Sequence, residues 1–346
     1  MISKTDFLIL HAWLNAFLVA RTRIFFSGLS EVFKTTENWW AALAVYFSIR
    51  KSARIRFRDT SISFFVTEDN WSDYRLLSKL LSGKNIHVEA NRFKFSYPSG
   101  LEFECDQNAL DFFANSLEMD CYYNDQHDLV CKVAGLKFIM PFPYGTFELR
   151  EIFIDKIYGE PYCKNAIIVD VGAFIGDSAL FFANKGAKLV VAFEPVPTLF
   201  DILKKNIILN GFQEVIQARN EALSDQSGIF NIGYIPKRPG SSSENPEEKA
   251  LFLEVPSITL SEVIMSLGWV DILKIDCEGC EYKILQHAGK SDALKHVGTI
   301  IMEVHSKVYS LIGLLRKKGF EIDKLRYDWP SRAWILSAHS SEQKTN

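Results

Sequence analysis

The sequence predicts an α/β fold with a mostly parallel sheet that carries helices on both faces. Two observations predict this fold. From about residue 165 onward, short apolar runs alternate with helical segments, which is the pattern of consecutive strand–helix units. A glycine-containing turn follows the first of these runs, and an acidic residue ends the second. Such sheets bind ligands beyond the carboxyl ends of their strands, so candidate functional residues are sought there.

The length and composition predict a globular chain of about two domains. A domain usually spans about 100–200 residues, and the chain has 346. Hydrophobic residues make up 48% and charged residues 23%, which excludes a largely disordered protein. We expect an N-terminal α+β region at 1–140, helical over 1–50 and mostly β over 53–140, with no chemical motif that indicates its role. The second domain is expected at 141–346.

The expected elements of the second domain follow one another in order. The predicted strands cover residues 166–171, 189–193, 215–218, 272–275 and 299–304, with a final hairpin of 320–326 and 333–337. The predicted helices cover residues 177–185, 198–209, 258–267, 281–287 and 307–318. The segment 236–249 is rich in Pro, Ser and Glu and cannot bury apolar area, so we expect a surface loop that is either a lid or an insertion.

The charge balance and the N-terminus restrict the partners. The chain has 39 Lys and Arg residues against 42 Asp and Glu residues, so its net charge of −3 gives no reason to expect nucleic acid. The apolar stretch at 7–20 is shorter than the ~20 residues of a membrane span. It predicts either a helix packed on the protein itself or an interfacial helix that contacts a membrane or a partner through residues 6–20. We expect a cytoplasmic protein.

The cysteines predict neither a disulfide framework nor a zinc site. They stand at positions 105, 121, 131, 163, 277 and 280, a density well below that of a disulfide-stapled domain. Cys277 and Cys280 form a C-x-x-C pair, but no second pair completes a set of four zinc ligands. We therefore expect reduced cysteines.

The turn from Asp170 to Asp177 (DVGAFIGD) follows the first strand and opens a helix. Gly172 and Gly176 let the backbone turn tightly and approach a ligand, and the free N–H groups of the helix start attract an anion. The turn has one glycine fewer than the dinucleotide fingerprint and an acid at the strand end, which would repel a pyrophosphate. It suits a ligand that carries both an ammonium and a carboxylate group.

The second strand ends in Phe193-Glu194-Pro195, and Glu194 stands 24 residues after Asp170. An acid at this place accepts hydrogen bonds from ribose hydroxyls in nucleotide-binding sheets. Glu194 therefore predicts a ligand that contains ribose.

The later strand ends carry the densest group of chemically active residues. Asp276 ends a strand and Glu278 follows it, while Lys274 alternates with Asp276 and shares its sheet face. Glu303 and His305 end the next strand and again share one face. Carboxylates and an imidazole thus converge at neighbouring strand ends. They are candidate bases, with helix capping or a purely structural histidine as the alternatives.

Six segments stand in a characteristic order along the chain. They are VDVGAFIGDSALFFA (169–183), VVAFEPVPTLFDILKKNIILNG (190–211), NEALSD (220–225), ITLSE (258–262), LKIDCEGCEYKIL (273–285) and IMEVH (301–305). This combination resembles the FkbM-type family of S-adenosylmethionine-dependent methyltransferases. It covers about half of the chain and leaves the N-terminal region outside.

The resemblance implies a class I methyltransferase fold, which is Rossmann-like with seven strands and a final antiparallel hairpin. It implies S-adenosylmethionine as the cofactor, with contacts from Asp170, Gly172, Ala173, Phe174, Gly176, Asp177, Glu194, Pro195, Glu221, Ala222 and Asp276. Family members commonly methylate hydroxyl groups of sugars or natural-product scaffolds, so we expect a small-molecule or glycan acceptor. The family often has Asn where Phe174 stands, which leaves the choice of acceptor open.

Methyl transfer to a hydroxyl is helped by a base that takes the proton. The candidate catalytic residues are Asp276, Glu278 and His305. The two acids could also bind a divalent cation, but the sequence shows no second group of oxygen ligands, and we expect no metal. Two other functions stay open, an NAD-dependent Rossmann oxidoreductase and a non-catalytic binding protein on a methyltransferase scaffold.

Overall fold

The computed structural model describes residues 119–141, 144–234, 251–328, 331 and 333–341, together with the backbone of five short strands between residues 52 and 105. The chain forms two compact units. The larger unit contains residues 136–141 and the described chain from 151 onward, and the smaller unit contains the other described residues. The predicted N-terminal helices, including residues 6–20, and the predicted loop at 236–249 lie outside the described residues.

The smaller unit is built from antiparallel strands. β1 (Ser52–Arg56) pairs with β2 (Ser63–Thr67), and β4 (Arg92–Ser96) pairs with both β3 (Ile86–Glu89) and β5 (Glu102–Cys105). A further hairpin consists of β6 (Asp120–Tyr123) and β7 (Leu129–Val133). Two further elements follow in the chain. β8 (Leu136–Ile139) belongs to the larger unit, and α5 (Thr146–Phe153) begins in the smaller one.

Two disulfides correct the expectation of reduced cysteines. Cys121 and Cys131 lie directly opposite each other on β6 and β7 and are bonded, and Cys277 is bonded to Cys280. Cys163 is free and buried. The low cysteine density misled the prediction, because a cross-strand pair and a tight turn each bring two sulfurs together without any larger framework.

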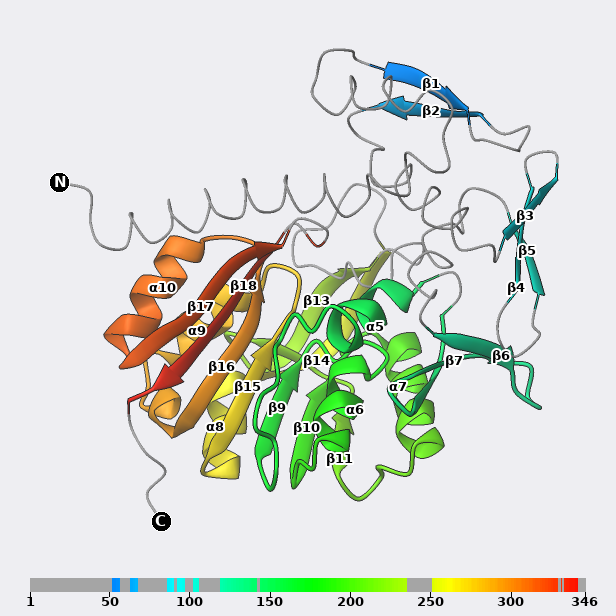
Figure 1. Ribbon diagram of the computed structural model, residues 1–346. Coiled ribbons are helices and arrows are strands. Elements are labelled where there is room, and N and C mark those ends of the chain that lie inside the picture. The colour runs from blue at the N-terminus through cyan, green and yellow to red at the C-terminus, as the bar shows by residue number, and fades with distance from the viewer. Residues whose placement is uncertain are drawn as a thin grey trace. The chain divides into compact units, whose positions relative to one another are not determined.

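The centre of the larger unit is a seven-stranded sheet in the order β11-β10-β9-β15-β16-β18-β17 (Figure 1). Its strands are β9 (Ile167–Val171), β10 (Leu189–Phe193), β11 (Ile216–Arg219), β15 (Val270–Ile275), β16 (Val297–Val304), β17 (Phe320–Asp328) and β18 (Ala333–Ser340). Neighbouring strands are parallel except at β18, which is antiparallel to both β16 and β17. The predicted fold class and the final hairpin are thus confirmed.

Helices cover both faces of this sheet (Figure 1). They are α6 (Asp177–Asn184), α7 (Pro197–Leu209), α8 (Leu260–Leu267), α9 (Glu281–Ala288) and α10 (Val308–Lys317), with a 3₁₀ turn at Ala293–His296. α8, α9 and α10 share one apolar core with the inner side chains of the strands, whereas α6 and α7 lie beside β9, β10 and β11. Local signals set the helix starts, since α7 begins at Pro197 and Thr259 forms a capping box with Glu262 before α8. No helix among the described residues is long and apolar enough to cross a membrane.

A small sheet in the order β12-β14-β13 interrupts the strand–helix alternation. It consists of β12 (Ala222–Ser224), β13 (Gly228–Tyr234) and β14 (Leu251–Thr259). The sequence does not predict β13 or the greater part of β14. Ile229, Leu251 and Phe252 are exposed, so several apolar residues of these strands lie outside the core and obscure the strand pattern.

The strand order places the site. β9 lies between β10 and β15, so the chain first moves to one side of β9 and later returns to its other side. Such a reversal opens a crevice at the carboxyl ends of the two central strands. Lys274 on β15 lies in register with Asp170 on β9, which brings the two predicted turns to the same sheet edge.

Candidate active site

The turn after β9 lies directly against the turn after β15. Gly172 has a φ of +76°, and a Cβ added there would lie 1.7 Å from the carbonyl oxygen of Asp276. Gly176 precedes α6 with a φ of +93°, and a Cβ there would lie 2.7 Å from Cδ1 of Leu203. Both glycines are thus required for a close approach, but the close neighbour is the protein itself. The two turns form one packed unit.

Asp170 is fully buried beneath this unit and is paired inside the protein. Its Oδ1 lies 3.1 Å from Nζ of Lys274, and its Oδ2 accepts a hydrogen bond of 2.7 Å from Ser178 Oγ. Burial raises the pKa of Asp170, and Lys274 opposes this shift. The sequence suggested a ligand ammonium as the partner of Asp170, whereas in this structure the ammonium is that of Lys274.

Lys274 joins the two turns. Its Nζ donates hydrogen bonds to the carbonyl oxygens of Gly172 at 2.7 Å and Val171 at 3.4 Å, and lies 4.0 Å from Oδ2 of Asp276. Burial acts to lower the pKa of this lysine, but Asp170 and Asp276 raise it above its ordinary value. The predicted shared face of Lys274 and Asp276 is confirmed, and the buried lysine carries a charge that holds the edge together.

Glu194 ends β10 at the same edge. It is buried, and its two carboxylate oxygens accept hydrogen bonds from the backbone N–H groups of Phe174 at 2.9 Å and Val196 at 2.8 Å. Burial raises the pKa of Glu194 to about 8, although both hydrogen bonds favour the charged form. Glu194 therefore holds the glycine turn, and its carboxyl group keeps capacity for a further hydrogen bond.

The other predicted cofactor residues surround this edge. Ala173 and Phe174 are buried in the turn, and Asp177 is buried in the first turn of α6. Glu221 pairs with Arg219 at 2.5 Å, and Ala222 begins β12. These residues lie at or near the carboxyl-end edge of the sheet, and their role in cofactor binding stays a prediction.

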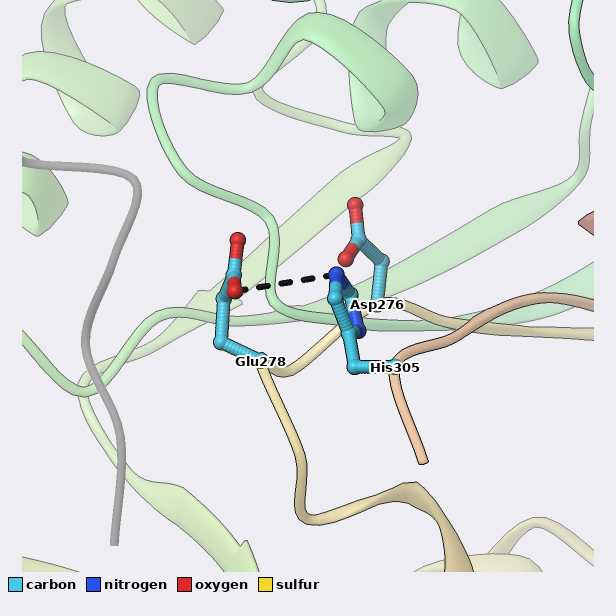
Figure 2. A group of neighbouring side chains, drawn as sticks. All are labelled: Asp276, Glu278 and His305. Atoms are coloured by element: carbon cyan, nitrogen blue, oxygen red, sulfur yellow. Dashed lines mark ion pairs between the residues drawn. The ribbon is translucent and has the colours of Figure 1, made fainter. Parts of the chain in front are cut away.

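Asp276, Glu278 and His305 form a half-buried cluster of neighbouring side chains (Figure 2). One ligand atom from each residue lies within 4.8 Å of the other two, and Oε2 of Glu278 is 3.6 Å from Nε2 of His305. Glu278 has a left-handed φ of +53°, which turns the chain between β15 and α9. The predicted convergence of the two strand ends is confirmed. The spacing suits a cation, but spacing alone does not identify a metal site, and we assign none.

Strong electrostatic coupling distinguishes this cluster. His305 is held by Glu281, whose Oε1 lies 2.7 Å from Nδ1. Burial acts to lower the pKa of His305, but Glu281, Glu278 and Asp276 raise it to about 10. Burial and the nearby Asp276 raise the pKa of Glu303 to about 9. At neutral pH the imidazole of His305 is therefore protonated on both nitrogens and positively charged, and the carboxyl group of Glu303 is neutral.

The sequence did not identify four residues of the site. Asn220 donates to the carbonyl oxygens of Glu194 at 2.8 Å and Pro195 at 3.0 Å, and Ser178 holds Asp170. The hydroxyl of Tyr158 lies 3.5 Å from Oδ2 of Asp276, and burial raises its pKa well above its usual value. Ser178, Asn220 and Glu281 stand within the six motif segments, whereas nothing in the sequence connects Tyr158 with a site 118 residues away.

Known proteins resemble this chain over the same region. Residues 170–322 match the family described as the methyltransferase FkbM domain. Methyltransferase sdnD of Sordaria araneosa is 29% identical over 57% of this chain and 91% of that protein. Methyltransferase 1 of Beauveria bassiana is 27% identical over 52% of this chain and 82% of that protein.

A crystal structure of methyltransferase FkbM from Methylobacillus flagellatus aligns with a TM-score of 0.39 at 14% identity, over 68% of this chain and 55% of that one. The family match is the informative comparison, because it begins at Asp170 and includes both turns of the site. Residues 170–322 therefore match the methyltransferase FkbM domain family, as the motifs predict.

Proposed function

We propose that this chain transfers a methyl group from S-adenosylmethionine to a hydroxyl group of a sugar, a glycan or a natural-product-like small molecule. One observation carries the proposal. The glycine turn after β9 packs against Asp276, which in turn lies within the cluster with Glu278 and His305. A cofactor seated on that turn would thus present its reactive end to the only strand end among the described residues where two acids and an imidazole gather.

The residues present fit the cofactor. Gly172 and Gly176 let the turn pack tightly against Asp276 and Leu203, and the N-terminal end of α6 favours a carboxylate through its helix dipole. Glu194 stands at the end of the second strand, where ribose hydroxyls are bound in such sheets. When bound, S-adenosylmethionine supplies a methyl group already activated by a sulfonium. The protein then has to align the acceptor and exclude water.

The acceptor hydroxyl must lose its proton as its oxygen takes the methyl group. Nε2 of His305 faces the exposed part of the cluster, next to Glu278. Because the pKa of His305 is about 10, this nitrogen is free in only a small fraction of molecules at neutral pH. A positive charge beside the cluster, such as the sulfonium of S-adenosylmethionine, lowers the pKa of His305 and increases the fraction of molecules in which Nε2 carries no proton. Asp276 and Glu278 orient the hydroxyl, and they are the alternative proton acceptors.

The kind of acceptor is inferred from charge and from relatives. The net charge of −3 supplies no attraction for a polyanion. One relative, the AMB antimetabolite synthetase AmbE of Pseudomonas aeruginosa, is 28% identical over half of this chain and a tenth of its own length, and its name points to small-molecule chemistry. Both observations favour an uncharged small acceptor.

Calorimetry on the full chain tests the proposal. We expect S-adenosylmethionine and its demethylated product to bind and NAD⁺ not to bind. Glu194→Ala should weaken binding, while Glu214→Ala, at an exposed position after α7, should not change it. Binding of NAD⁺ alone would identify an oxidoreductase. Cofactor binding without transfer of radiolabelled methyl to any compound in a panel of sugars and polyketide alcohols would contradict the proposed reaction.

A further inference from the structure

His305 and Glu281 come from different elements and meet below the site. His305 follows β16, and Glu281 is the first residue of α9. Nδ1 of the imidazole lies 2.7 Å from Oε1 of Glu281. The side chain of Glu281 is 1% exposed, against 20% for His305. The carboxylate therefore holds the inner nitrogen of the ring, and water has little access to this contact.

The opposite nitrogen of the ring faces the exposed part of the site. Nε2 of His305 lies 3.6 Å from Oε2 of Glu278, whose side chain is 40% exposed. A hydroxyl group that enters beside Asp276 and Glu278 can therefore meet Nε2, whereas Nδ1 is occupied. The two nitrogens have different surroundings, and only one of them is available to a substrate.

Glu281 is itself fixed by the turn that carries Glu278. Oε1 of Glu281 accepts a hydrogen bond of 3.0 Å from the backbone N–H of Gly279. Glu278 and Gly279 both have left-handed backbone conformations, with φ of +53° and +104°. One carboxylate oxygen thus connects the end of β16 to the turn after β15, so the ring and the turn keep one geometry.

We propose that Glu281 is a positioning residue that keeps a proton on Nδ1 of His305 and thereby directs Nε2 toward the acceptor hydroxyl. A carboxylate that accepts from one ring nitrogen fixes both the ring orientation and the tautomer. The inference rests on the proposed function, because it assigns the other nitrogen to the acceptor. Glu281 does not touch the acceptor, and it acts only through His305.

The charges around His305 determine which proton the ring loses. Glu281 faces it from α9, Asp276 and Glu278 from the turn after β15, and Glu303 from β16. All four are acids. Asp276, Glu278 and Glu281 favour the doubly protonated ring, whereas Glu303 is itself neutral at neutral pH. The proton on Nδ1 lies in a buried contact of 2.7 Å and the proton on Nε2 lies near the exposed Glu278, so the second is the one released as the pH rises.

The tautomer can be measured without knowing the acceptor. The full chain is labelled with ¹⁵N-histidine, and the ring nitrogens are followed by long-range ¹H–¹⁵N correlation as the pH rises. The signals of His305 are assigned by their loss in His305→Asn. We expect the neutral ring to be the Nδ1–H form. An Nε2–H form in the unmodified protein would overturn the proposal, and this result needs no variant that has to fold.

Two variants separate positioning from a merely structural role. Glu281→Gln keeps an oxygen that accepts from Nδ1 but removes the charge, so the tautomer should persist while the titration midpoint of His305 falls by about one pH unit or more. Glu281→Leu removes the acceptor, so the Nδ1–H form should no longer dominate. An unchanged midpoint in a folded Glu281→Gln protein would also overturn the proposal.

The chain offers a matched control. Nδ1 of His339 lies 2.6 Å from Oδ1 of Asp323, the same kind of contact at an exposed position far along the last hairpin. Asp323→Asn should change the signals of His339 and leave those of His305 unchanged. Calorimetry with S-adenosylmethionine on the same samples keeps the two hypotheses apart. Failure to bind the cofactor contradicts the proposed function, and the wrong tautomer contradicts only the role of Glu281.

Discussion

Gly172 and the carbonyl oxygen of Asp276 lie so close that a Cβ on Gly172 would stand 1.7 Å from that oxygen. These residues are 104 positions apart in the sequence, yet the ends of β9 and β15 share one contact. The turn expected to hold the cofactor and the strand end expected to face the methyl group therefore cannot move independently. A change in one of the two turns should be detected in the other.

Gly172→Ala should disrupt the site. The added methyl group meets backbone rather than a flexible side chain, and the φ of +76° adds strain of about 1–2 kcal/mol. We expect a lower free energy of unfolding and loss of cofactor binding, measured by denaturant titration and calorimetry. Gly211→Ala is the control, because Gly211 has a φ of +74° with nothing within 4 Å. Equal effects of the two substitutions would show that the contact with Asp276 does not matter.

Lys274→Met should destabilise the fold more than the usual core substitution. It leaves Asp170 buried without its cationic partner, and breaking one side of a buried ion pair costs about 3–5 kcal/mol. In the double variant Asp170→Asn/Lys274→Met no buried charge of the pair is left, so its loss of unfolding free energy should be smaller than the sum of the two single losses. Urea denaturation of the unmodified protein, the two single variants and the double variant gives the coupling free energy between Asp170 and Lys274. Simple additivity would mean that the two residues do not stabilise each other.

Glu194 should make stability depend on pH. Its pKa in the folded protein is about 8, above the ordinary 4.5, because burial disfavours the charged form. Below about pH 4.5 Glu194 is protonated in both the folded and the unfolded state, so its ionisation does not reduce the free energy of unfolding. As the pH rises to about 8 the unfolded chain ionises first, so the folded state loses stability, by about 3–5 kcal/mol in total.

The measurement is the free energy of unfolding of the unmodified protein and of Glu194→Gln across this range. The variant lacks the ionisation, so its advantage should grow between about pH 4.5 and pH 8 and then stay constant. A difference that does not change with pH would show that folding leaves the pKa of Glu194 unshifted, and a change in the opposite direction would show that folding lowers it.

His305→Ala should slow methyl transfer by about 10²–10⁴-fold, the usual contribution of a general base, while leaving cofactor affinity unchanged. Asp276→Asn should also slow transfer, because Asp276 lies between the glycine turn and His305. In the unmodified enzyme the rate should rise with pH toward about 10, as the imidazole loses its proton. The rates follow from single-turnover assays once an acceptor is found. Full activity in both variants would remove the two residues from the reaction.

Local sequence patterns were sufficient to predict most strands of the seven-stranded sheet. The apolar runs that became β9, β10, β15 and β16 are short and continuous because these strands are buried on both faces. The strands β13 and β14 were missed, because much of their surface is exposed and residues 235–250 stand between them in the chain. The second disulfide was missed for another reason, since spacing does not show whether two sulfurs meet.

The sequence by itself determined the resemblance to the FkbM family, the strand–helix alternation and the residue types at the strand ends. These features depend on local periodicity and on short motifs such as those around Asp170, Glu194 and Asp276. Only the tertiary structure decided their partners. It paired Asp170 with Lys274, placed Gly172 under Asp276 and brought Glu281 to the inner nitrogen of His305. The physical reason is that pairing, burial and the resulting pKa shifts depend on contacts between distant segments, which no local pattern encodes.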